Sequence, residues 1–266
     1  METADTSSRD TSPNGSRPGL DDAPPALEVD HVSAAYGPYR ALFDISFSVP
    51  AGGVCALLGS NGAGKSTVAR VVSGLMPSSN GSIRVDGEDV TGRPAYRVAR
   101  AGMAHVPEGR GIFANLTVEE NLVLAFRQRV GRRQVGDSLA RAYEGFPILG
   151  ERRRQRGGTL SGGQQRLLSL AKVLVAPPKL FVADELSLGL APVVIETVYE
   201  GLRKINRAGT ALLVVEQQVD RAVGLAEDAV ILEHGGVAYS GPARRAKEEM
   251  EQILASRTVG SSSFSG

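Results

Sequence analysis

The segment Gly59-Ser60-Asn61-Gly62-Ala63-Gly64-Lys65-Ser66-Thr67 fits the phosphate-loop pattern, and its surroundings are those that the pattern requires. The apolar run 53–58 precedes it and predicts a buried strand, and a helix is predicted directly after it, over residues 65–74. In such a loop, glycines let backbone N–H groups turn around a β-phosphate, Lys65 reaches the β- and γ-phosphates, and the Ser66 hydroxyl ligates Mg²⁺. The segment therefore predicts a nucleotide site; a glycine-rich turn that fits by chance is the alternative.

The overall composition is that of a globular protein. The length of 266 residues suits one large α/β domain or two small ones, and 42% of the residues are apolar, enough for a real core. The net charge of +1 gives no electrostatic reason to expect binding to nucleic acid or to an anionic membrane. Cys55 stands alone in an apolar run, so we expect a core residue and no disulfide, which fits a reducing cytosol. No apolar stretch approaches the roughly 20 residues that cross a bilayer.

The composition changes at both ends of the chain. Residues 1–25 are rich in Ser, Asp, Pro, Gly and Thr and predict a disordered tail, and residues 257–266 predict a flexible tail on the same grounds. Between them, residues 26–256 alternate strand and helix patterns and are expected to form one domain. Repeated strand–helix–strand units predict a parallel sheet with right-handed crossovers.

The individual runs predict an α/β fold with a mainly parallel sheet core and an antiparallel β edge. The predicted strands are 27–32 and 43–49 at that edge, then 53–58, 82–86, 103–106, 179–185 and 210–216, with a hairpin over 229–240 that turns at Gly235-Gly236. Further helices are predicted over 94–101, 192–207, 219–226 and about 242–255. Segment 111–176 contains a capping box from Thr117 to Glu120 and is interpreted as an inserted helical subdomain.

Two adjacent acids, Asp184 and Glu185, stand at the end of the predicted strand 179–185. Asp184 is the candidate for the second ligand of the magnesium ion that a nucleoside triphosphate needs. Glu185 follows it, where the backbone has turned, so its carboxylate can face the γ-phosphate and orient the attacking water. A hydrolase needs both roles filled, and here they are adjacent. The alternative is an ordinary acidic turn.

A second anion cradle is predicted at Leu160-Ser161-Gly162-Gly163-Gln164, which precedes an apolar helix. Ser161 and the following N–H groups would lie at the positive end of that helix. One nucleotide does not need two cradles. Two chains placed head to tail do, because each cradle can close on the γ-phosphate that the other chain's loop holds.

With these segments in this order, residues 27–255 closely resemble the ATP-binding subunits of ABC transporters. The resemblance implies a P-loop NTPase fold and a two-chain ATP sandwich with a composite site. It places Tyr36 where the family stacks an aromatic ring on adenine; the alternative is a tyrosine that only covers a strand end. It also matches Ser187-Leu-Gly-Leu to the segment that crosses between the two monomers.

Three positions depart from the family pattern. Glu108, within Val106-Pro-Glu-Gly-Arg, replaces a glutamine that senses the γ-phosphate and contacts the membrane subunit, and it joins Ser66 and Asp184 as a candidate metal ligand. Gln217 replaces the switch histidine; it can donate a hydrogen bond to a phosphate oxygen but cannot shuttle a proton. Leu186 replaces a proline, which puts the geometry of Glu185 in doubt. If hydrolysis persists, Glu185 activates the water and Gln217 only positions it; a weakened or silent ATPase is the alternative.

The departures at Glu108 and Gln217, together with Thr117-Val-Glu-Glu-Asn and Ser187-Leu-Gly-Leu-Ala-Pro, are similar to the second ATPase of branched-chain amino-acid importers, a subgroup that also includes ATPases of urea and short-amide importers. The resemblance implies ATP and Mg²⁺ as cofactors, with Glu185, Gln217 and Lys65 as the catalytic residues. It further implies a peripheral place on the cytoplasmic face of the cell membrane. The implied partners are two transmembrane permease subunits, a second ABC ATPase in a heterodimer or homodimer, and, indirectly, a solute-binding protein, but no nucleic acid.

Two other classes are weighed against this interpretation. A soluble ABC ATPase that acts on DNA or ribosomes usually carries long coiled coils, zinc sites or two cassettes in one chain, and none is evident in this sequence. A small-molecule kinase shares the phosphate loop but has no role for Leu160-Ser161-Gly162-Gly163-Gln164.

Overall fold

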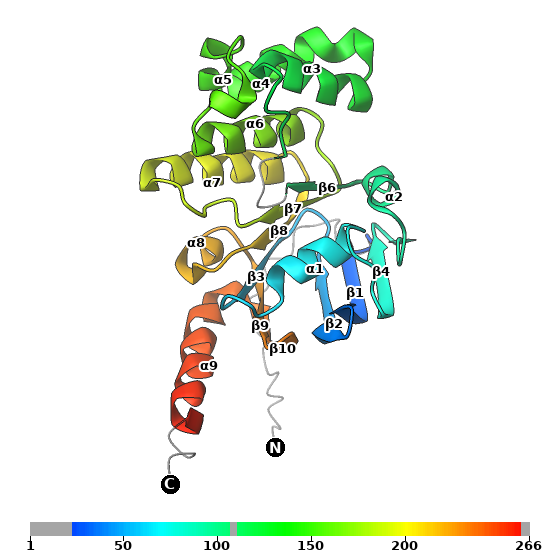
Figure 1. The fold of residues 1–266 in the computed structure, drawn as a ribbon, viewed down its shortest axis with the longest axis vertical. Helices are drawn as coiled ribbons and strands as arrows, with labels where there is room; N and C mark the ends of the chain where they lie inside the picture. Colours follow the sequence, from blue (N-terminus) through cyan, green and yellow to red (C-terminus); the bar gives the residue numbers. More distant parts are fainter. Residues whose placement is uncertain (1–22, 107–110, 262–266) are drawn as a thin grey trace, which may run out of the picture.

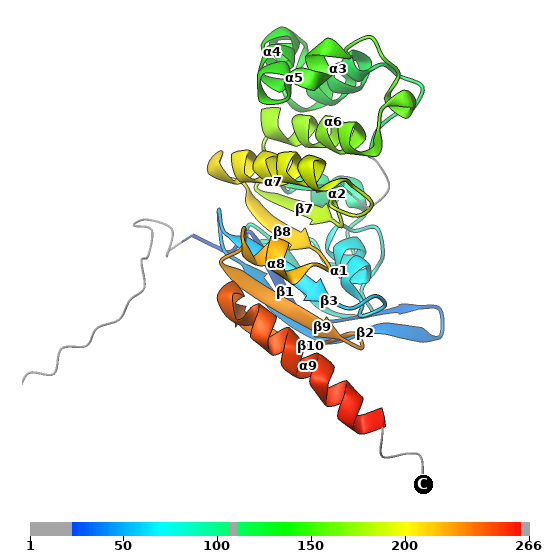
Figure 2. The same cartoon turned by 90° about the vertical axis from the view of Figure 1, so that its left-hand side faces the viewer.

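The computed structural model describes residues 23–106 and 111–261. These residues form two sheets with helices around them, and the helices of the middle third of the chain lie together at one end (Figures 1 and 2). The tail predicted over 1–25 lies outside the described residues except for residues 23–25, and residues 262–266 of the other predicted tail also lie outside.

The larger sheet has six strands in the order β10-β9-β3-β8-β7-β6. Its strands are β3 (Val54–Gly59), β6 (Met103–Val106), β7 (Leu180–Asp184), β8 (Ala211–Val215), β9 (Asp228–Glu233) and β10 (Gly236–Pro242). The pairs β3–β8, β3–β9, β6–β7 and β7–β8 are parallel, and only the edge strand β10 runs antiparallel to its neighbour. The prediction of a mainly parallel sheet core is therefore confirmed.

The strands predicted as an antiparallel edge form a sheet of their own. It has the order β2-β1-β4-β5 and consists of β1 (Leu27–Tyr36), β2 (Tyr39–Val49), β4 (Asn80–Val85) and β5 (Glu88–Asp89). All of its pairs are antiparallel. Exposed and buried residues alternate along most of β2. The smaller sheet is therefore covered on one side only, as antiparallel sheets commonly are.

The helices divide between the sheets and the far end of the molecule. They are α1 (Lys65–Val72), α2 (Ala95–Arg100), α3 (Val118–Arg129), α4 (Val135–Gly145), α5 (Pro147–Glu151), α6 (Gly162–Val175), α7 (Pro192–Arg207), α8 (Val219–Val223) and α9 (Ala246–Ser261), with short 3-10 turns at Arg132–Gln134, Gly157–Thr159 and Ala243–Arg245. Helices α3 to α6 lie within residues 111–176 and stand at the top of Figure 1, above α7 and the larger sheet. The boundary of this helical subdomain stays a prediction.

The central strands β3, β7 and β8 of the larger sheet are buried on both faces, and alternate residues of β3 and β7 enter different cores. Cys55 and Leu57 of β3 pack with α1 and the smaller sheet, whereas Ala56 and Leu58 pack with α8 and α9. On β7, Phe181 and its neighbours on the same face pack with α3, α6 and α7. This two-residue period explains why the strands read as continuous apolar runs. Cys55 is the predicted core residue, and burial raises the pKa of its thiol to about 12.

The sequence signal for the start of α3 is confirmed, whereas the end of α9 differs from its predicted position. The Thr117 hydroxyl accepts from the Glu120 N–H at 3.1 Å and the Glu120 carboxylate accepts from the Thr117 N–H at 2.7 Å, which is the predicted capping box. Helix α9 continues to Ser261, so the prediction of a flexible tail from residue 257 is wrong for its first part. The sequence has no proline there and no glycine before Gly260, so nothing stops the helix earlier.

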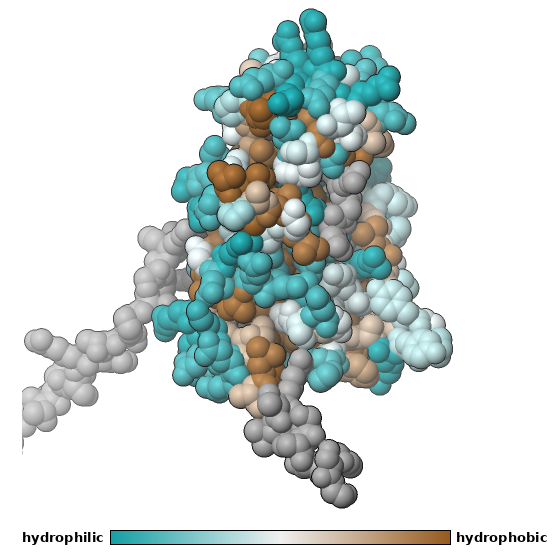
Figure 3. All heavy atoms as spheres, turned by 60° about the vertical axis from the view of Figure 1, so that its left-hand side comes forward, coloured by the Kyte–Doolittle hydropathy of each residue, from teal (hydrophilic) through white to brown (hydrophobic). Residues whose placement is uncertain are grey.

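The described residues include no helix that combines the length and the hydropathy needed to cross a bilayer. On the face shown in Figure 3, hydrophobic side chains form several separate groups between hydrophilic ones. Scattered apolar groups of this kind are ordinary on the surface of a folded protein.

Gly235, in the turn between β9 and β10, joins three segments that are far apart in the sequence. Its carbonyl accepts from the Phe43 N–H at 2.8 Å, and its own N–H donates to the Ala63 carbonyl at 3.0 Å. Its φ of +78° is in the left-handed region, and a Cβ atom added there would lie 2.4 Å from the Ala41 carbonyl oxygen. The predicted turn at Gly235-Gly236 is therefore confirmed and also connects β2, the phosphate loop and the hairpin.

We expect Gly235→Ala to lower the free energy of unfolding by at least about 2 kcal/mol, because the left-handed backbone disfavours alanine and the contact is with rigid backbone. For a domain of this size that corresponds to a fall in Tm of roughly 4–8 °C, measured by differential scanning calorimetry. The matched control is Gly236→Ala, whose added Cβ would be 3.6 Å from the nearest atom and whose φ is not positive. Equal Tm values for both variants would contradict this account of the turn.

Candidate functional site

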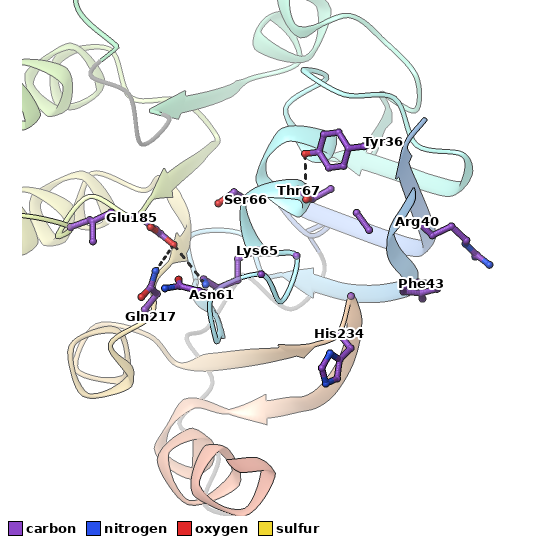
Figure 4. A pocket seen from close by; sticks show the side chains of 15 residues that line it. Tyr36, Arg40, Phe43, Asn61, Lys65, Ser66, Thr67, Glu185, Gln217 and His234 are labelled. Carbon is purple, nitrogen blue, oxygen red and sulfur yellow. Dashed lines mark hydrogen bonds and ion pairs between the residues drawn. The ribbon is translucent and has the colours of Figure 1, made fainter. Parts of the chain in front are cut away.

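A cavity of about 810 Å³ opens beside the phosphate loop (Figure 4). Its walls come from the end of β1, from β2, from the start of α1, from the segments that follow β7 and β8, and from the turn between β9 and β10. The lining residues are Tyr36, Arg40, Ala41, Phe43, Asn61, Gly62, Gly64, Lys65, Ser66, Thr67, Glu185, Leu188, Gln217, His234 and Gly235. Most residues of the predicted loop and both predicted catalytic partners of Lys65 thus line one cavity.

The phosphate loop leaves β3 at Gly59 and enters α1 at Lys65. Gly59 needs to be glycine, because its φ is +148° and an added Cβ would lie 2.6 Å from the Leu232 carbonyl oxygen on β9. Gly62 and Gly64 also have positive φ. Ser60 and Ala63 belong to the same loop without lining the cavity. The sequence prediction of a strand, a tight loop and a helix N-terminus is confirmed as local structure.

Lys65 is a buried cation whose ammonium group is held by its own loop. Its side chain is 4% exposed, and Nζ donates to the Gly59 carbonyl at 3.0 Å and to the Ser60 carbonyl at 3.2 Å. A carboxylate oxygen of Glu185 lies 3.7 Å from Nζ. A buried charge needs such partners, since removing it from water costs several kcal/mol.

The acidic pair stands at the carboxyl end of β7. Asp184 is the last residue of the strand and is buried, as is Glu185. Glu185 has φ +47°, a left-handed conformation that costs roughly 1–2 kcal/mol for a residue other than glycine. Its N–H donates to the Val215 carbonyl at 3.0 Å, and Leu186 beside it is buried in the core. Leu186 thus anchors the turn by packing.

Gln217 meets Glu185 at the cavity wall. The Gln217 amide Nε2 donates to Glu185 Oε1 at 3.2 Å, and this is the same oxygen that lies nearest to Lys65. Figure 4 shows the three side chains converging from the segments after β8 and β7 and from the start of α1. The amide therefore orients the carboxylate, which is a positioning contact and requires no proton transfer.

Tyr36 ends β1 and projects over the start of α1. Its ring lines the cavity and is 46% exposed, and its hydroxyl lies 3.4 Å from Thr67 Oγ1 and accepts from Arg70 Nη1 at 3.4 Å. The side chain is labelled in Figure 4 above Thr67. An exposed aromatic face held in place by its polar end can stack on a flat ring.

Ser161, Gly162, Gly163 and Gln164 do not line this cavity. Ser161 caps α6: its hydroxyl accepts from the Gln164 N–H at 3.3 Å, and the Gln164 side-chain oxygen accepts from the Ser161 N–H at 3.1 Å. Ser161 and Gly162 are exposed, whereas Gly163 packs so closely on α7 that an added Cβ would lie 2.2 Å from Val194. Within one copy of the chain, the predicted cradle at Ser161 is therefore separate from the cavity at the phosphate loop.

The candidate magnesium ligands are only partly described. Ser66 lines the cavity and Asp184 stands at the strand end beside it, whereas Glu108 lies outside the described residues. A hydroxyl and a carboxylate are the hard oxygen donors that Mg²⁺ prefers, and Mg²⁺ commonly takes only one or two protein ligands next to phosphates. Within 23–106 and 111–261, no three His, Cys, Asp or Glu side chains are grouped as a metal site. The donors present fit a magnesium ion shared with a nucleotide.

Sequence reasoning missed three cavity residues, Arg40, Phe43 and His234. Arg40 and Phe43 project from β2, with the guanidinium carbon 4.9 Å from the centre of the Phe43 ring, and His234 stands at the tip of the turn before β10. No local pattern marks them. They reach the site only because Gly235 docks against β2 and the phosphate loop.

Comparisons with known proteins agree with this geometry. The family described as "ABC transporter" matches residues 42–187. The "High-affinity branched-chain amino acid transport ATP-binding protein BraG" of Pseudomonas aeruginosa is 42% identical over 212 residues, which are 79% of this chain and 90% of that protein. The "Probable branched-chain amino acid transport ATP-binding protein LivF" of Archaeoglobus fulgidus is 33% identical over 223 residues, 84% of this chain and 94% of that protein.

A solved structure described as "Structure of ATP binding subunit of ABC transporter" has a TM-score of 0.73 and 27% sequence identity, covering 85% of this chain and 94% of that one. The fold, the cavity and the family match are thus mutually consistent. The chain belongs to the ABC transporter family, as one of its ATP-hydrolysing, nucleotide-binding members.

Proposed function

We propose that this chain is the energy-coupling ATPase subunit of a membrane importer for branched-chain or related amino acids. The solute class is supported by the 42% identity to a protein named for branched-chain amino acid transport, over 90% of that protein's length. A urea or short-amide importer is the alternative within the same subgroup, and a soluble ABC ATPase not tied to transport is the alternative outside it.

The observation that carries the proposal is the incomplete cavity. It has a phosphate loop, a carboxylate at Glu185, an amide at Gln217 and an aromatic face at Tyr36, whereas Ser161 caps α6 elsewhere. A second ATPase chain, either another copy or a related protein, would supply Ser161 to the γ-phosphate. ATP would then close the dimer, and hydrolysis would open it.

Each residue has a chemical role in this proposal. Lys65, already desolvated, would exchange its contact with Glu185 for the β- and γ-phosphates, which releases the carboxylate. Glu185 would then orient the attacking water, and Gln217 would hold its side chain in place. Tyr36 would stack on adenine. A magnesium ion held by Ser66 and Asp184, with Glu108 as a further candidate, would neutralise charge on the phosphates.

The partners follow from the role. We propose that two transmembrane permease subunits receive the motion of the dimer on the cytoplasmic face of the cell membrane, through the loop that contains Glu108. A solute-binding protein would act on the other side of the permease, without direct contact with this chain. Co-sedimentation of the protein with membranes, without retention on nucleic acid, would support this role over that of a soluble ABC ATPase.

The solute is tested by uptake in cells that carry Glu185→Gln in the chromosomal copy. We expect uptake of radiolabelled leucine, isoleucine and valine to fall to the background, with unchanged uptake of a solute carried by another system. Loss of urea uptake alone would favour the alternative importer. Unchanged uptake of all these solutes, with the variant present at the parental amount, would contradict the importer proposal.

In the purified protein, Glu185→Gln should reduce ATP turnover by about 100-fold or more, since it removes the group that activates water. It should leave ATP bound and trap a closed dimer, which size-exclusion chromatography with and without ATP detects. The amide keeps the shape of the side chain, so the Tm should change little. Turnover at the parental rate would reject the role of Glu185.

Tyr36→Ala should weaken nucleotide binding. Stacking on a base contributes about 1–3 kcal/mol, which is roughly a 5-fold to 150-fold rise in Kd. Isothermal titration calorimetry with ADP measures the effect without hydrolysis. The matched control is Tyr39→Ala, because Tyr39 is 77% exposed in the same hairpin and does not line the cavity. Equal Kd values for parent and Tyr36→Ala would mean that the ring only covers the strand end.

A further inference from the structure

Glu216 is a buried carboxylate that the proposed chemistry does not use. It follows β8 directly, precedes Gln217 and is 4% exposed. Its N–H donates to the Leu57 carbonyl at 3.1 Å, which extends the pairing with β3 by one residue. Burial raises the pKa of this carboxyl, against the effect of its hydrogen bonds. A charge placed here is costly unless it is paired.

The hydrogen bonds of Glu216 go to the turn that follows the catalytic carboxylate. Oε1 accepts from the Ser187 backbone N–H at 3.3 Å, and Oε2 accepts from the Ser187 hydroxyl at 2.9 Å. Ser187 is itself buried. On the other side stands Tyr199 of α7, whose phenol has its pKa raised by burial and then by the nearby Glu216 carboxylate. The carboxylate is therefore fixed between α7 and the turn.

The turn that Glu216 holds, Ser187 to Leu190, lies between two parts of the molecule. Leu188 is 48% exposed and lines the nucleotide cavity. Leu188, Gly189 and Leu190 also line a hollow that they share with Leu160 and Gly162 at the start of α6. The turn thus borders both the nucleotide cavity and the start of the second predicted cradle.

Contacts between this turn and the end of β8 are few. The Glu185 N–H donates to the Val215 carbonyl, Gln217 donates to Glu185, and Ser187 donates to Glu216. Behind these contacts lies a cavity of about 130 Å³, lined by the turn, Ile195, Gln218 and Arg221 among others. Because a hollow separates the turn from the segment after β8 there, the Ser187–Glu216 hydrogen bonds fix the distance between the turn and that segment, which also carries Gln217.

We propose that Glu216 is a positioning residue for ATP hydrolysis: it anchors the turn Ser187 to Leu190, so that closure of a partner chain on this turn is transmitted to Glu185 and Gln217. The inference rests on the proposed function, since it needs a partner at the turn. It assigns no chemistry to Glu216 itself, which contacts neither the nucleotide cavity nor Lys65 in the described residues.

The first test compares Glu216→Ala with Glu216→Gln in the purified protein. Glu216→Ala should lower kcat by about 10-fold to 100-fold, as expected when a catalytic group is misplaced by a fraction of an ångström to an ångström. Its ADP Kd should stay within about threefold of the parent, because the phosphate loop is untouched. Glu216→Gln should restore kcat to within about threefold, since its oxygen can accept from the Ser187 N–H and its NH₂ can donate to the Ser187 hydroxyl.

The second test uses the Glu185→Gln background, where turnover plays no part. Adding Glu216→Ala should raise the ATP concentration that gives half-maximal dimer by about tenfold, and Ser187→Ala should then add little, because both changes break the same contact. Asp220→Ala is the control: Asp220 is exposed on α8, pairs with Lys247 at 2.9 Å and should leave both readouts unchanged.

The inference is overturned if Glu216→Ala keeps the parental kcat and the parental dimerisation, or if ADP binding falls in step with kcat. The latter would mean that Glu216 only stabilises the fold. The proposed function is tested by the parent protein and by the Glu185→Gln variant alone. The positioning role of Glu216 is tested by comparing Glu216→Ala with Glu216→Gln. A failure of the proposed function can therefore be distinguished from a failure of this inference.

Discussion

The parallel register of β3, β8 and β7 brings Lys65, Glu185 and Gln217 together at one sheet edge. Val215 of β8 pairs with Leu57 of β3 on one side and with Asp184 of β7 on the other. When neighbouring parallel strands end at the same height, the residues that follow them lie side by side. Open α/β sheets therefore bind ligands at the carboxyl ends of their strands. The phosphate loop, the acidic pair and the Glu216-Gln217 pair therefore need no long connection to meet. Their encounter is a result of backbone pairing in a fully buried sheet.

Within that edge, each charge is matched before a ligand arrives. Lys65 has two backbone carbonyls and the Glu185 carboxylate, Glu185 has Lys65 and Gln217, and Glu216 has Ser187. Such mutual pairing keeps buried ions tolerable in the fold. In the proposed function, a bound phosphate would change several contacts together, because it would compete for Lys65 and so alter the contacts of Glu185 and Gln217. The strained backbone of Glu185 concentrates this change at one residue.

The features that could be predicted from the sequence are those with local causes. The phosphate loop, the capping box at Thr117 and the turn at Gly235 each follow from neighbouring residues, and continuous apolar runs predict the parallel strands. The rest depends on packing at long range. Arg40 and His234 are separated by most of the chain, and the antiparallel strands form their own sheet through pairing with β4, which no periodicity in β1 announces. Ser187 and Glu216 are 29 residues apart, and no local pattern in the sequence predicts their contact.

The neighbours of β3 have a consequence for synthesis. This strand carries the phosphate loop, yet it pairs with β8 and β9, and the loop is tied at Ala63 to Gly235. All of these partners are translated long after the loop has left the ribosome. A nascent chain therefore has its nucleotide-binding sequence early but its scaffold only near the end of translation. Until then, the apolar strand stays without its complete sheet, and a chain truncated before β9 lacks one of the two strands that flank β3 as well as the contact of Gly235 with Ala63.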